Sequence, residues 1–391
     1  MPLSSLVRTV PAALLILLPA QAEEFHGFDP AVFDGRMLAP EQLEAMVADA
    51  QHNTPPRNGV SYVFGFANLQ RDMIFGIRVE ESIKANVEAA GMEVLVADNR
   101  LDGATALSNA QSFVRRQVDY VIEFQTDINF GPVIMQHFDR AQTGVIAIDI
   151  PMPGAIFFGA DNPRSGFMCG SYLAQAARER FGPQVFETAY LVVGELPQSG
   201  VIPAMRTNGQ VAGFLAAAPG FAEERIIKID TKNTLQYSFQ QMGNVLGRIP
   251  SDAPILITAI NDQSVTGMLR AVKQKGRQPY ALAVGMGADE QETLIGEENF
   301  VASVAYFPER YGNYLIPIAL MQLAGRPLPS AFLVQHVFVT PANICKYYPE
   351  FPCVDEEALA YEFPAKAFAE HLHSLKANLE LAEYRELIPD H

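Results

Sequence analysis

Two apolar runs on either side of a helix-length segment decide the fold of this chain: Tyr120-Val-Ile-Glu-Phe124, then Pro132–Ala141, then Val145-Ile-Ala-Ile-Asp149. Both runs have the length and the β-branched content of buried strands, whereas the segment between them is long enough for a helix. A strand, a helix and a second strand in this order form a βαβ unit, in which the two strands lie parallel. We therefore expect a parallel sheet covered by helices.

The same alternation continues on both sides of this unit. Upstream, one face of a helix that ends at Gly91 carries apolar residues at four-residue spacing, namely Phe75, Val79, Ile83 and Val87. A first series of strands is expected at Val60–Phe66, Val94–Ala97, Tyr120–Phe124, Val145–Asp149 and Ile156–Gly159. A second series is expected at Ala189–Val193, Ile226–Ile229, Pro254–Ile260, Ala281–Gly285 and Val301–Ala305. The pattern predicts an α/β fold with two tandem doubly wound lobes, each built on one parallel sheet.

The chain continues beyond the second series. A helix is expected at Pro308–Leu323, followed by one strand at Phe332–Val339. The last residues form an appended tail, in which we expect a helix at Glu356–Leu379. The sequence suggests no function for this tail.

Length and composition limit the functional classes. The 391 residues suffice for about two domains, and 49% hydrophobic with 18% charged residues describes a globular chain with a large core. The formal net charge is -16, from 44 acidic and 28 basic side chains. This charge argues against a nucleic-acid partner or an anionic membrane surface, because both repel a polyanion.

The N-terminus has the features of a cleavable signal peptide. Arg8 precedes a short apolar run at Val10–Pro19, and Ala20-Gln-Ala22 provides an A-x-A cleavage site. A transmembrane anchor would need about 20 apolar residues, roughly twice the length of this run. No cysteine follows the site to carry a lipid anchor. We expect export to the periplasm with cleavage near Ala22.

The three cysteines fit an oxidising compartment. Cys345 and Cys353 lie close together in a stretch rich in proline and tyrosine, where a disulfide would close a short loop. The alternative is two unpaired surface thiols. Cys169 lies within an apolar helical pattern and is expected to be a buried small hydrophobic residue.

Candidate ligand contacts follow from the strand ends, since open α/β sheets bind ligands beyond the carboxyl ends of their strands. Polar residues gather there at 68–75, 125–127, 149, 198–206, 231–233, 261–262 and 285–289. Two facing lobes would bring these edges together at a cleft. The carboxylate, amide and guanidinium groups of the set are suited to binding hydroxyl groups.

Motifs for catalysis are missing from the sequence. Gly285-Met-Gly287 only weakly matches a dinucleotide loop, because Glu290 stands where the third glycine would be. The chain has no P-loop, HExxH, CxxC or G-x-S-x-G motif. Asp127 begins a stretch similar to a calcium loop, but its glycine falls one position early. We expect no enzyme activity, no cofactor and no metal.

Several strand-end segments together resemble the ribose- and galactose-type periplasmic binding proteins, the sugar-specific branch of the type I ABC-transporter receptors. The resemblance runs from about Val60 to Val339. It rests on the order and spacing of Val145-Ile-Ala-Ile-Asp149, Phe158-Gly-Ala-Asp-Asn162, Arg206-Thr-Asn-Gly209, Ala259-Ile-Asn-Asp262, Val284-Gly285 and Ala302-Ser-Val-Ala-Tyr-Phe-Pro308.

The resemblance implies two lobes joined by a three-strand hinge, with crossings near Asp161–Asn162, Tyr306–Phe307 and Gln335–His336. The expected divisions are a signal peptide at 1–22, an N-terminal extension at 23–57, an N-terminal lobe at 58–162 plus 307–335, a C-terminal lobe at 163–306 plus 336–344, and a C-terminal extension at 345–391.

The resemblance also implies the roles of particular residues. Asp149, Arg206 and Asn261 match positions that bind sugar hydroxyls. Phe75 matches an aromatic residue that packs on the sugar ring, Asp72 matches a polar residue just before it, and Tyr306 stands where many members have glutamine. Strand-end polar residues complete the expected ligand-binding set, which is Asp72, Phe75, Gln125, Asp149, Arg206, Asn233, Asn261 and Tyr306.

Three departures from the family pattern leave the solute open. Ile150 stands where ribose-type members have arginine, Gly287 where an aspartate is usual, and Asn233 where an aromatic residue is common. Together these departures argue against ribose itself.

Each of these residues has a structural alternative. Asp149 could cap the next element, Arg206 could form a surface ion pair, and Phe75 could belong to the core. For the helix after Asn261, we expect Asp262 to be the cap and Asn261 to contact the ligand.

The sequence thus predicts the substrate-binding component of an ABC importer, which closes by a hinge on a small polyhydroxylated solute, a sugar or polyol. We expect it to act as a monomer with a membrane permease as its partner. A sensor that presents a signal molecule to a membrane chemoreceptor or kinase is the alternative. A LacI-type repressor would need an N-terminal helix-turn-helix and a basic face, and the expected signal peptide and the acidic balance count against it.

Overall fold

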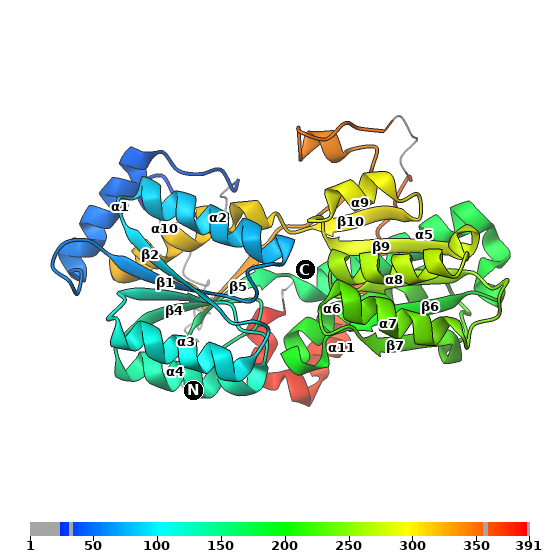
Figure 1. The fold of residues 1–391 in the computed structure, drawn as a ribbon, viewed down its shortest axis with the longest axis horizontal. Helices are drawn as coiled ribbons and strands as arrows, with labels where there is room; N and C mark the ends of the chain where they lie inside the picture. The colour runs from blue at the N-terminus through cyan, green and yellow to red at the C-terminus, as the bar shows by residue number, and fades with distance from the viewer. Residues whose placement is uncertain (1–23, 31–33, 355–358, 389–391) are drawn as a thin grey trace, which may run out of the picture.

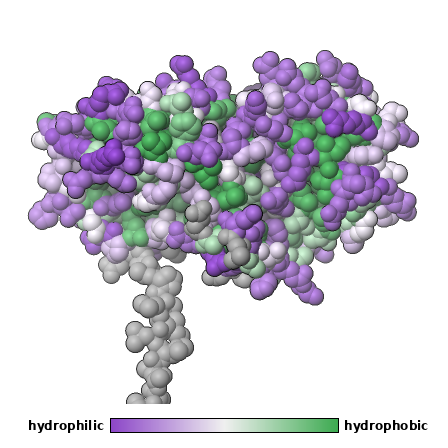
Figure 2. Space-filling view, turned by 90° about the horizontal axis from the view of Figure 1, so that it is seen from below, coloured by the Kyte–Doolittle hydropathy of each residue, from purple (hydrophilic) through white to green (hydrophobic). Residues whose placement is uncertain are grey.

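The computed structural model describes residues 24–30, 34–354 and 359–388, which form two α/β lobes side by side (Figure 1). The expected signal peptide lies outside the described residues. Within the described part, no helix combines the length and the apolar character needed to cross a membrane. The face seen in Figure 2 is mostly hydrophilic, with apolar patches over both lobes.

The N-terminal lobe is built on six parallel strands in the order β11-β5-β4-β3-β1-β2. Alternate residues of these strands enter different cores, because successive side chains of a strand point to opposite faces. Phe64 and Phe66 belong to the core with α2 and α10, whereas Ala67 packs with α3 and α4. The strands are β1 (Val63–Asn68), β2 (Glu93–Asp98), β3 (Tyr120–Glu123), β4 (Gly144–Ile148), β5 (Ile156–Ala160) and β11 (Ala331–Val334), and the helices are α2 (Ile74–Ala89), α3 (Gly103–Arg115), α4 (Gly131–Arg140) and α10 (Tyr311–Leu323).

The C-terminal lobe repeats this plan with strand order β12-β10-β9-β8-β6-β7, in which only β12 is antiparallel to its neighbour. These described sheets confirm the predicted pair of doubly wound lobes. The strands are β6 (Tyr190–Glu195), β7 (Ile226–Asp230), β8 (Ile255–Ala259), β9 (Ala281–Gly287), β10 (Phe300–Ala305) and β12 (Val337–Val339), and the helices are α5 (Asn162–Phe181), α6 (Val201–Ala217), α7 (Leu235–Leu246), α8 (Asp262–Gln274) and α9 (Gln291–Gly296).

Helices α5 and α6 pack unusually closely. A Cβ added to Gly166 would lie 2.0 Å from the carbonyl oxygen of Arg206, and one added to Gly170 would lie 1.8 Å from that of Gln210. Glycine at these positions therefore lets the two backbones touch, which fixes the position of Arg206 on α6.

The chain changes sheet between β5 and β6, between β10 and β11, and between β11 and β12. The single strand predicted at Phe332–Val339 is therefore wrong: its two halves belong to different sheets, with a break at Gln335–His336. The backbone N–H of Asp161 donates to Nε2 of His336 at 3.0 Å, which ties two connecting segments together. Burial lowers the pKa of His336 to about 3, so its imidazole is neutral and can accept this bond.

Segments that precede and follow the two lobes in the sequence are also folded. Helix α1 (Pro40–Asn53), within the segment expected as an N-terminal extension, packs on α10 and buries Leu43, Met46 and Ala50. Beyond β12, Cys345 and Cys353 are joined in the predicted disulfide, while Cys169 is buried and unpaired.

The helix predicted at Glu356–Leu379 is shorter than expected. Helix α11 (Ala365–Ala377) begins after Pro364, and of the residues before it, 355–358 lie outside the described part. Residues 359–364 are not helical, and Tyr361 packs against Tyr172 and Phe338 instead. Contacts with the lobe thus override the local helical pattern. The chain then forms the 3-10 segment η8 (Leu379–Leu387).

Strand β3 ends in a buried carboxyl group. Glu123 is only 1% exposed, and Nδ2 of Asn99 donates to its Oε1 at 2.8 Å. Its Oε2 has no hydrogen-bond partner among the described residues. Burial raises the pKa of Glu123 from 4.5 to about 8, against the smaller effect of the Asn99 bond. The carboxyl group is therefore protonated in the folded protein at neutral pH.

We predict that Glu123→Gln removes a pH dependence of stability. Because the folded-state pKa is raised, Glu123 favours folding below pH 4.5, and this contribution is lost as pH rises towards 8. Relative to the glutamine variant, the wild type should lose about 1.4 kcal/mol of unfolding free energy per pH unit across this window. Urea titrations at several pH values measure the difference. A difference in unfolding free energy between wild type and Glu123→Gln that does not change with pH would contradict the prediction. So would the same pH-dependent difference between wild type and the exposed control Glu88→Gln.

Candidate functional site

A small cavity of about 60 Å³ lies between the two lobes, at the carboxyl ends of their strands. Six of the eight predicted site residues line it, which are Phe75, Asp149, Arg206, Asn233, Asn261 and Tyr306. The remaining lining residues are Leu69, Met73, Phe124, Thr126, Ile150, Leu196, Ser199, Pro203, Ile260 and Met286. The strand-end rule thus leads to one cavity between the lobes.

Asp149 follows β4 and is held in a left-handed backbone conformation, with φ of 58°. Aspartate tolerates this conformation better than most residues. The backbone N–H of Ala160 donates to its Oδ1 at 3.2 Å. A Cβ on Gly159 would lie 2.5 Å from the same oxygen, so only glycine leaves room for the carboxylate. Burial raises the pKa of Asp149, and the positive charge of Arg206 lowers it by a smaller amount.

Arg206 brings a positive charge to the cavity from α6, with only 6% of the residue exposed. Its Nε donates to Oδ1 of Asn162 at 2.8 Å, and its Nη1 donates to the carbonyl oxygen of Ile260 at 2.9 Å. The guanidinium group also lies over the Tyr306 ring, 4.9 Å from its centre. These contacts exclude the surface ion pair considered as the alternative.

Asn261 is both a helix cap and a cavity residue. Its Oδ1 accepts the backbone N–H of Ser264 at 2.9 Å, so the expectation that Asp262 caps α8 is wrong. Asp262 is already the first helical residue, and its carboxylate accepts from Oγ of Ser303 at 2.7 Å and from the backbone N–H of Asp289 at 3.2 Å. Burial raises the pKa of Asp262 to about 6.

The two predicted aromatic residues line the cavity and also pack in the core. The Phe75 ring meets Phe124 and Tyr311 edge-on, with ring centres 6.1 and 5.7 Å apart. The Tyr306 ring contacts the Arg206 guanidinium group and meets the His336 ring edge-on, with ring centres 5.0 Å apart. The binding role and the core role of Phe75 are therefore compatible.

Two predicted residues do not line the cavity. Asp72 is exposed and forms a hydrogen bond with the nearby Gln70. Gln125 is buried, but its Oε1 accepts the backbone N–H of Asp127 at 2.6 Å. Phe124 and Thr126 line the cavity on either side of Gln125, as expected where successive side chains of an extended segment point in opposite directions.

Thr126 and Ser199 also line the cavity; both lie in the strand-end segments 125–127 and 198–206 but are not among the eight predicted ligand-binding residues. The Oγ1 of Thr126 is buried and has no hydrogen-bond partner within the described residues. The Oγ of Ser199, from the C-terminal lobe, donates to the Thr126 carbonyl oxygen at 2.9 Å. Side-chain alternation beyond β3 selects Thr126 over Gln125 within its segment, whereas the strand-end rule points to 198–206 without selecting Ser199.

The lobes also touch away from the cavity. Nη2 of Arg78 on α2 donates to Oε1 of Gln291 on α9 at 2.6 Å. Together with the Ser199–Thr126 bond, this contact joins the lobes directly. Such bonds require the lobes to be close together, as they are in this structure.

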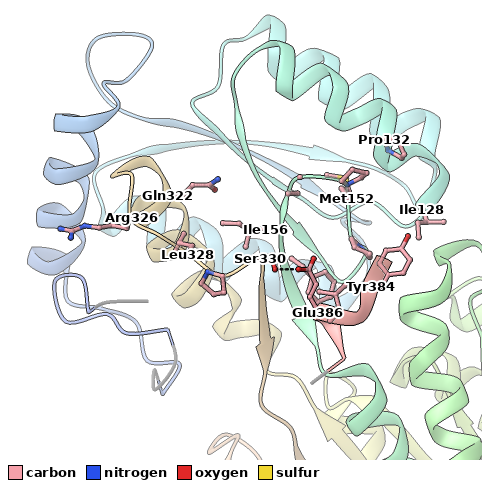
Figure 3. Close-up of a pocket in the computed structure, with 17 residues that line it drawn as sticks. Ile128, Pro132, Met152, Ile156, Gln322, Arg326, Leu328, Ser330, Tyr384 and Glu386 are labelled. Atoms are coloured by element: carbon pink, nitrogen blue, oxygen red, sulfur yellow. Dashed lines mark hydrogen bonds between the residues drawn. The ribbon is translucent and has the colours of Figure 1, made fainter. Parts of the chain in front are cut away.

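A larger hollow of about 520 Å³ lies on the N-terminal lobe (Figure 3). Its walls come from residues 151–157, the end of α10 with the residues after it, and Tyr384 and Glu386 of the C-terminal tail. It does not lie at the carboxyl ends of both sheets. None of the eight predicted ligand-binding residues lines it.

The polar residues of the interlobe cavity, all in the described part of the chain, offer hydrogen bonds and no metal site. No group of three or more histidine, cysteine, aspartate or glutamate side chains in the described ranges is arranged to hold a metal ion. A carboxylate, a guanidinium group, amides and hydroxyls instead converge from both lobes, and this donor set suits a small polar solute.

Comparison with known proteins agrees with this geometry. Residues 64–327 match the family model described as the periplasmic binding protein domain. The ribose import binding protein of Salmonella typhimurium is 22% identical over 293 residues, which covers 74% of this chain and 93% of that protein.

Solved structures show the same fold. A solute-binding protein from Actinobacillus succinogenes with bound D-allose has a TM-score of 0.61 at 16% identity, covering 74% of this chain and all 100% of that one. One from Mycobacterium smegmatis with bound glycerol has a TM-score of 0.61 at 19% identity, covering 77% and 100%. The match spans most of this chain, and the chain belongs to the periplasmic binding protein domain family, as a type I member of the ribose and galactose type.

Proposed function

We propose that this chain is the periplasmic receptor of an ABC importer and that it binds a sugar or polyol between its lobes. The observation that carries the proposal is the convergence of Asp149, Arg206 and Asn261 on one interlobe cavity. Asp149 comes from the N-terminal lobe and the other two from the C-terminal lobe. A solute that binds all three therefore favours the closed form over the open form.

The hydrogen-bonding capacity of these residues supports hydroxyl recognition. Oδ1 of Asp149 is bound to the backbone, which leaves its other oxygen for a ligand hydroxyl. Nε and Nη1 of Arg206 are engaged, which leaves Nη2 as a donor. The capping role of Asn261 uses its oxygen, which leaves its NH₂ group. One acceptor and two donors can thus bind neighbouring hydroxyl groups.

Selectivity and transport follow from closure. A solute enclosed between the lobes loses its water, so a missing hydroxyl would leave a buried protein group without a partner. The closed pair of lobes would then be the form that the membrane permease binds. The relatives named above are an import binding protein for ribose and solute-binding proteins with bound allose and glycerol, and their ligands support the same solute class.

We predict that Asp149→Asn weakens binding about ten- to hundredfold, because a hydrogen bond to a charged group contributes about 1.5–3 kcal/mol. Asparagine keeps the side-chain volume and tolerates the positive φ, so the variant should remain folded. A thermal-shift panel of D-ribose, D-allose, D-galactose, myo-inositol and glycerol selects the ligand, and calorimetry then measures its Kd. The matched control is Asp72→Asn, which is exposed outside the cavity and should change Kd less than twofold. Equal affinity in wild type and Asp149→Asn would contradict the site.

A further inference from the structure

The interlobe cavity is largely apolar. Ten of its sixteen lining residues carry aliphatic, thioether or aromatic side chains. They contact the cavity from both lobes, with Leu69 and Met73 on the N-terminal side and Leu196, Ile260 and Met286 on the C-terminal side. Asp149 is the one carboxylate and Arg206 the one cation among these lining residues.

Several of the polar lining groups are already engaged within the protein. Ser199 donates to the Thr126 carbonyl oxygen, Asn261 caps α8, and Arg206 uses two of its nitrogens. Nδ2 of Asn233 faces a sulfur atom, Sδ of Met73, at 3.9 Å. A solute with hydroxyl groups on every side would therefore bury some of them against carbon atoms, where an unpaired hydroxyl is costly.

We infer that the solute is amphipathic, either a deoxy sugar or a methyl-bearing polyol. This inference rests on the function proposed above. Its hydroxyl groups bind Asp149, Arg206, Asn261 and the hydroxyl of Thr126. Its methyl or methylene groups lie against the Leu69, Met73 and Met286 side chains. Ile150, which follows Asp149 in the chain, adds another apolar side chain to the cavity wall.

Matched sugar pairs test this inference. The pairs are D-galactose with D-fucose, L-mannose with L-rhamnose, and D-ribose with 5-deoxy-D-ribose, measured by thermal shift and then by calorimetry. We expect the deoxy member of a responding pair to bind at least about tenfold more tightly. Tighter or equal binding of the fully hydroxylated member in every responding pair overturns the inference and leaves the proposed function intact. Silence of every pair and of the whole panel above, polyols included, overturns the proposed function itself.

A variant adds a readout within the same experiment. Met73→Gln replaces an apolar wall with an amide of similar size and should shift the preference towards the fully hydroxylated member. The control Ile77→Gln changes an exposed residue of α2, 38% accessible, and should leave the preference unchanged. An unchanged preference in Met73→Gln would count against the inference.

A separate observation concerns the C-terminal tail, which is attached to both lobes. The tail is held on the C-terminal lobe by a hydrogen bond at 2.8 Å between the hydroxyls of Tyr361 and Ser171. Helix α11 packs on α5 and α6 of the same lobe, where Phe368 meets Phe167 with ring centres 5.2 Å apart. In Figure 1 the helix lies below the junction of the lobes.

Beyond α11 the tail reaches the N-terminal lobe. Leu387 and Ile388 are buried in one apolar cluster with Phe157 of β5. The Oγ of Ser330, next to β11, donates to Oε2 of Glu386 at 2.9 Å, as Figure 3 shows. The same cluster includes Phe167 and Met205 of the C-terminal lobe, so one apolar core spans the junction.

We propose that the tail is a fourth connection between the lobes, which limits how far they open. The three peptide crossings allow a hinge motion, whereas the tail must lose its contact with Phe157 or with α5 and α6 before the lobes can separate widely. Burial of Leu387 and Ile388 makes the first of these losses costly.

Spin-label distances test the proposal without any ligand. Labels on Arg116→Cys and Lys275→Cys, both exposed positions on different lobes, report the opening. In the double variant Leu387→Ala/Ile388→Ala we expect a longer and broader distance distribution than in the labelled parent. The milder Glu386→Ala removes only an exposed hydrogen bond and should change the distribution in the same direction but less. Identical distributions in folded variants, as judged by circular dichroism, would overturn the proposal.

Discussion

The buried charge of Arg206 is the constraint on which the site depends. A guanidinium group that is 6% exposed must be compensated, because an unpaired buried charge is strongly destabilising. The compensation comes from Asn162 at the start of α5, from the carbonyl of Ile260 after β8 and from the ring of Tyr306 after β10. Asn162 and Tyr306 stand where the chain passes between lobes, so one side chain links the closeness of α5 and α6 to the geometry of the hinge and the cavity.

Sequence reasoning predicted the layers and the sheet edge but not every side-chain direction. Strand length, helix period and turn residues are local, so the two parallel sheets and the strand-end site could be predicted. Whether Gln125 or Thr126 lines the cavity depends on the direction of consecutive side chains, and the cap at Asn261 depends on where α8 begins. The helix of the tail begins later than predicted because aromatic contacts of Tyr361 with the lobe, absent from any local pattern, hold residues 359–364 in a non-helical form.

The cavity and the tail indicate how a common fold can be adapted. Backbone geometry positions Asp149 and Arg206 at the cavity, while apolar residues such as Ile150 and Met286 occupy the walls around them. Hydrophobic walls lower the number of hydroxyl groups that a solute can satisfy, and an added segment across the junction changes the balance between open and closed forms. Specificity and closure can therefore vary separately on the same pair of lobes.

A crystal structure of the mature chain, grown with the solute that gives the largest thermal shift, tests the central claim most directly. The account predicts density for that solute between the lobes, within hydrogen-bonding distance of Asp149, Arg206 and Asn261. Density in the hollow beside Ser330 and Glu386, or at any other site while the interlobe cavity is filled by protein side chains, would contradict it.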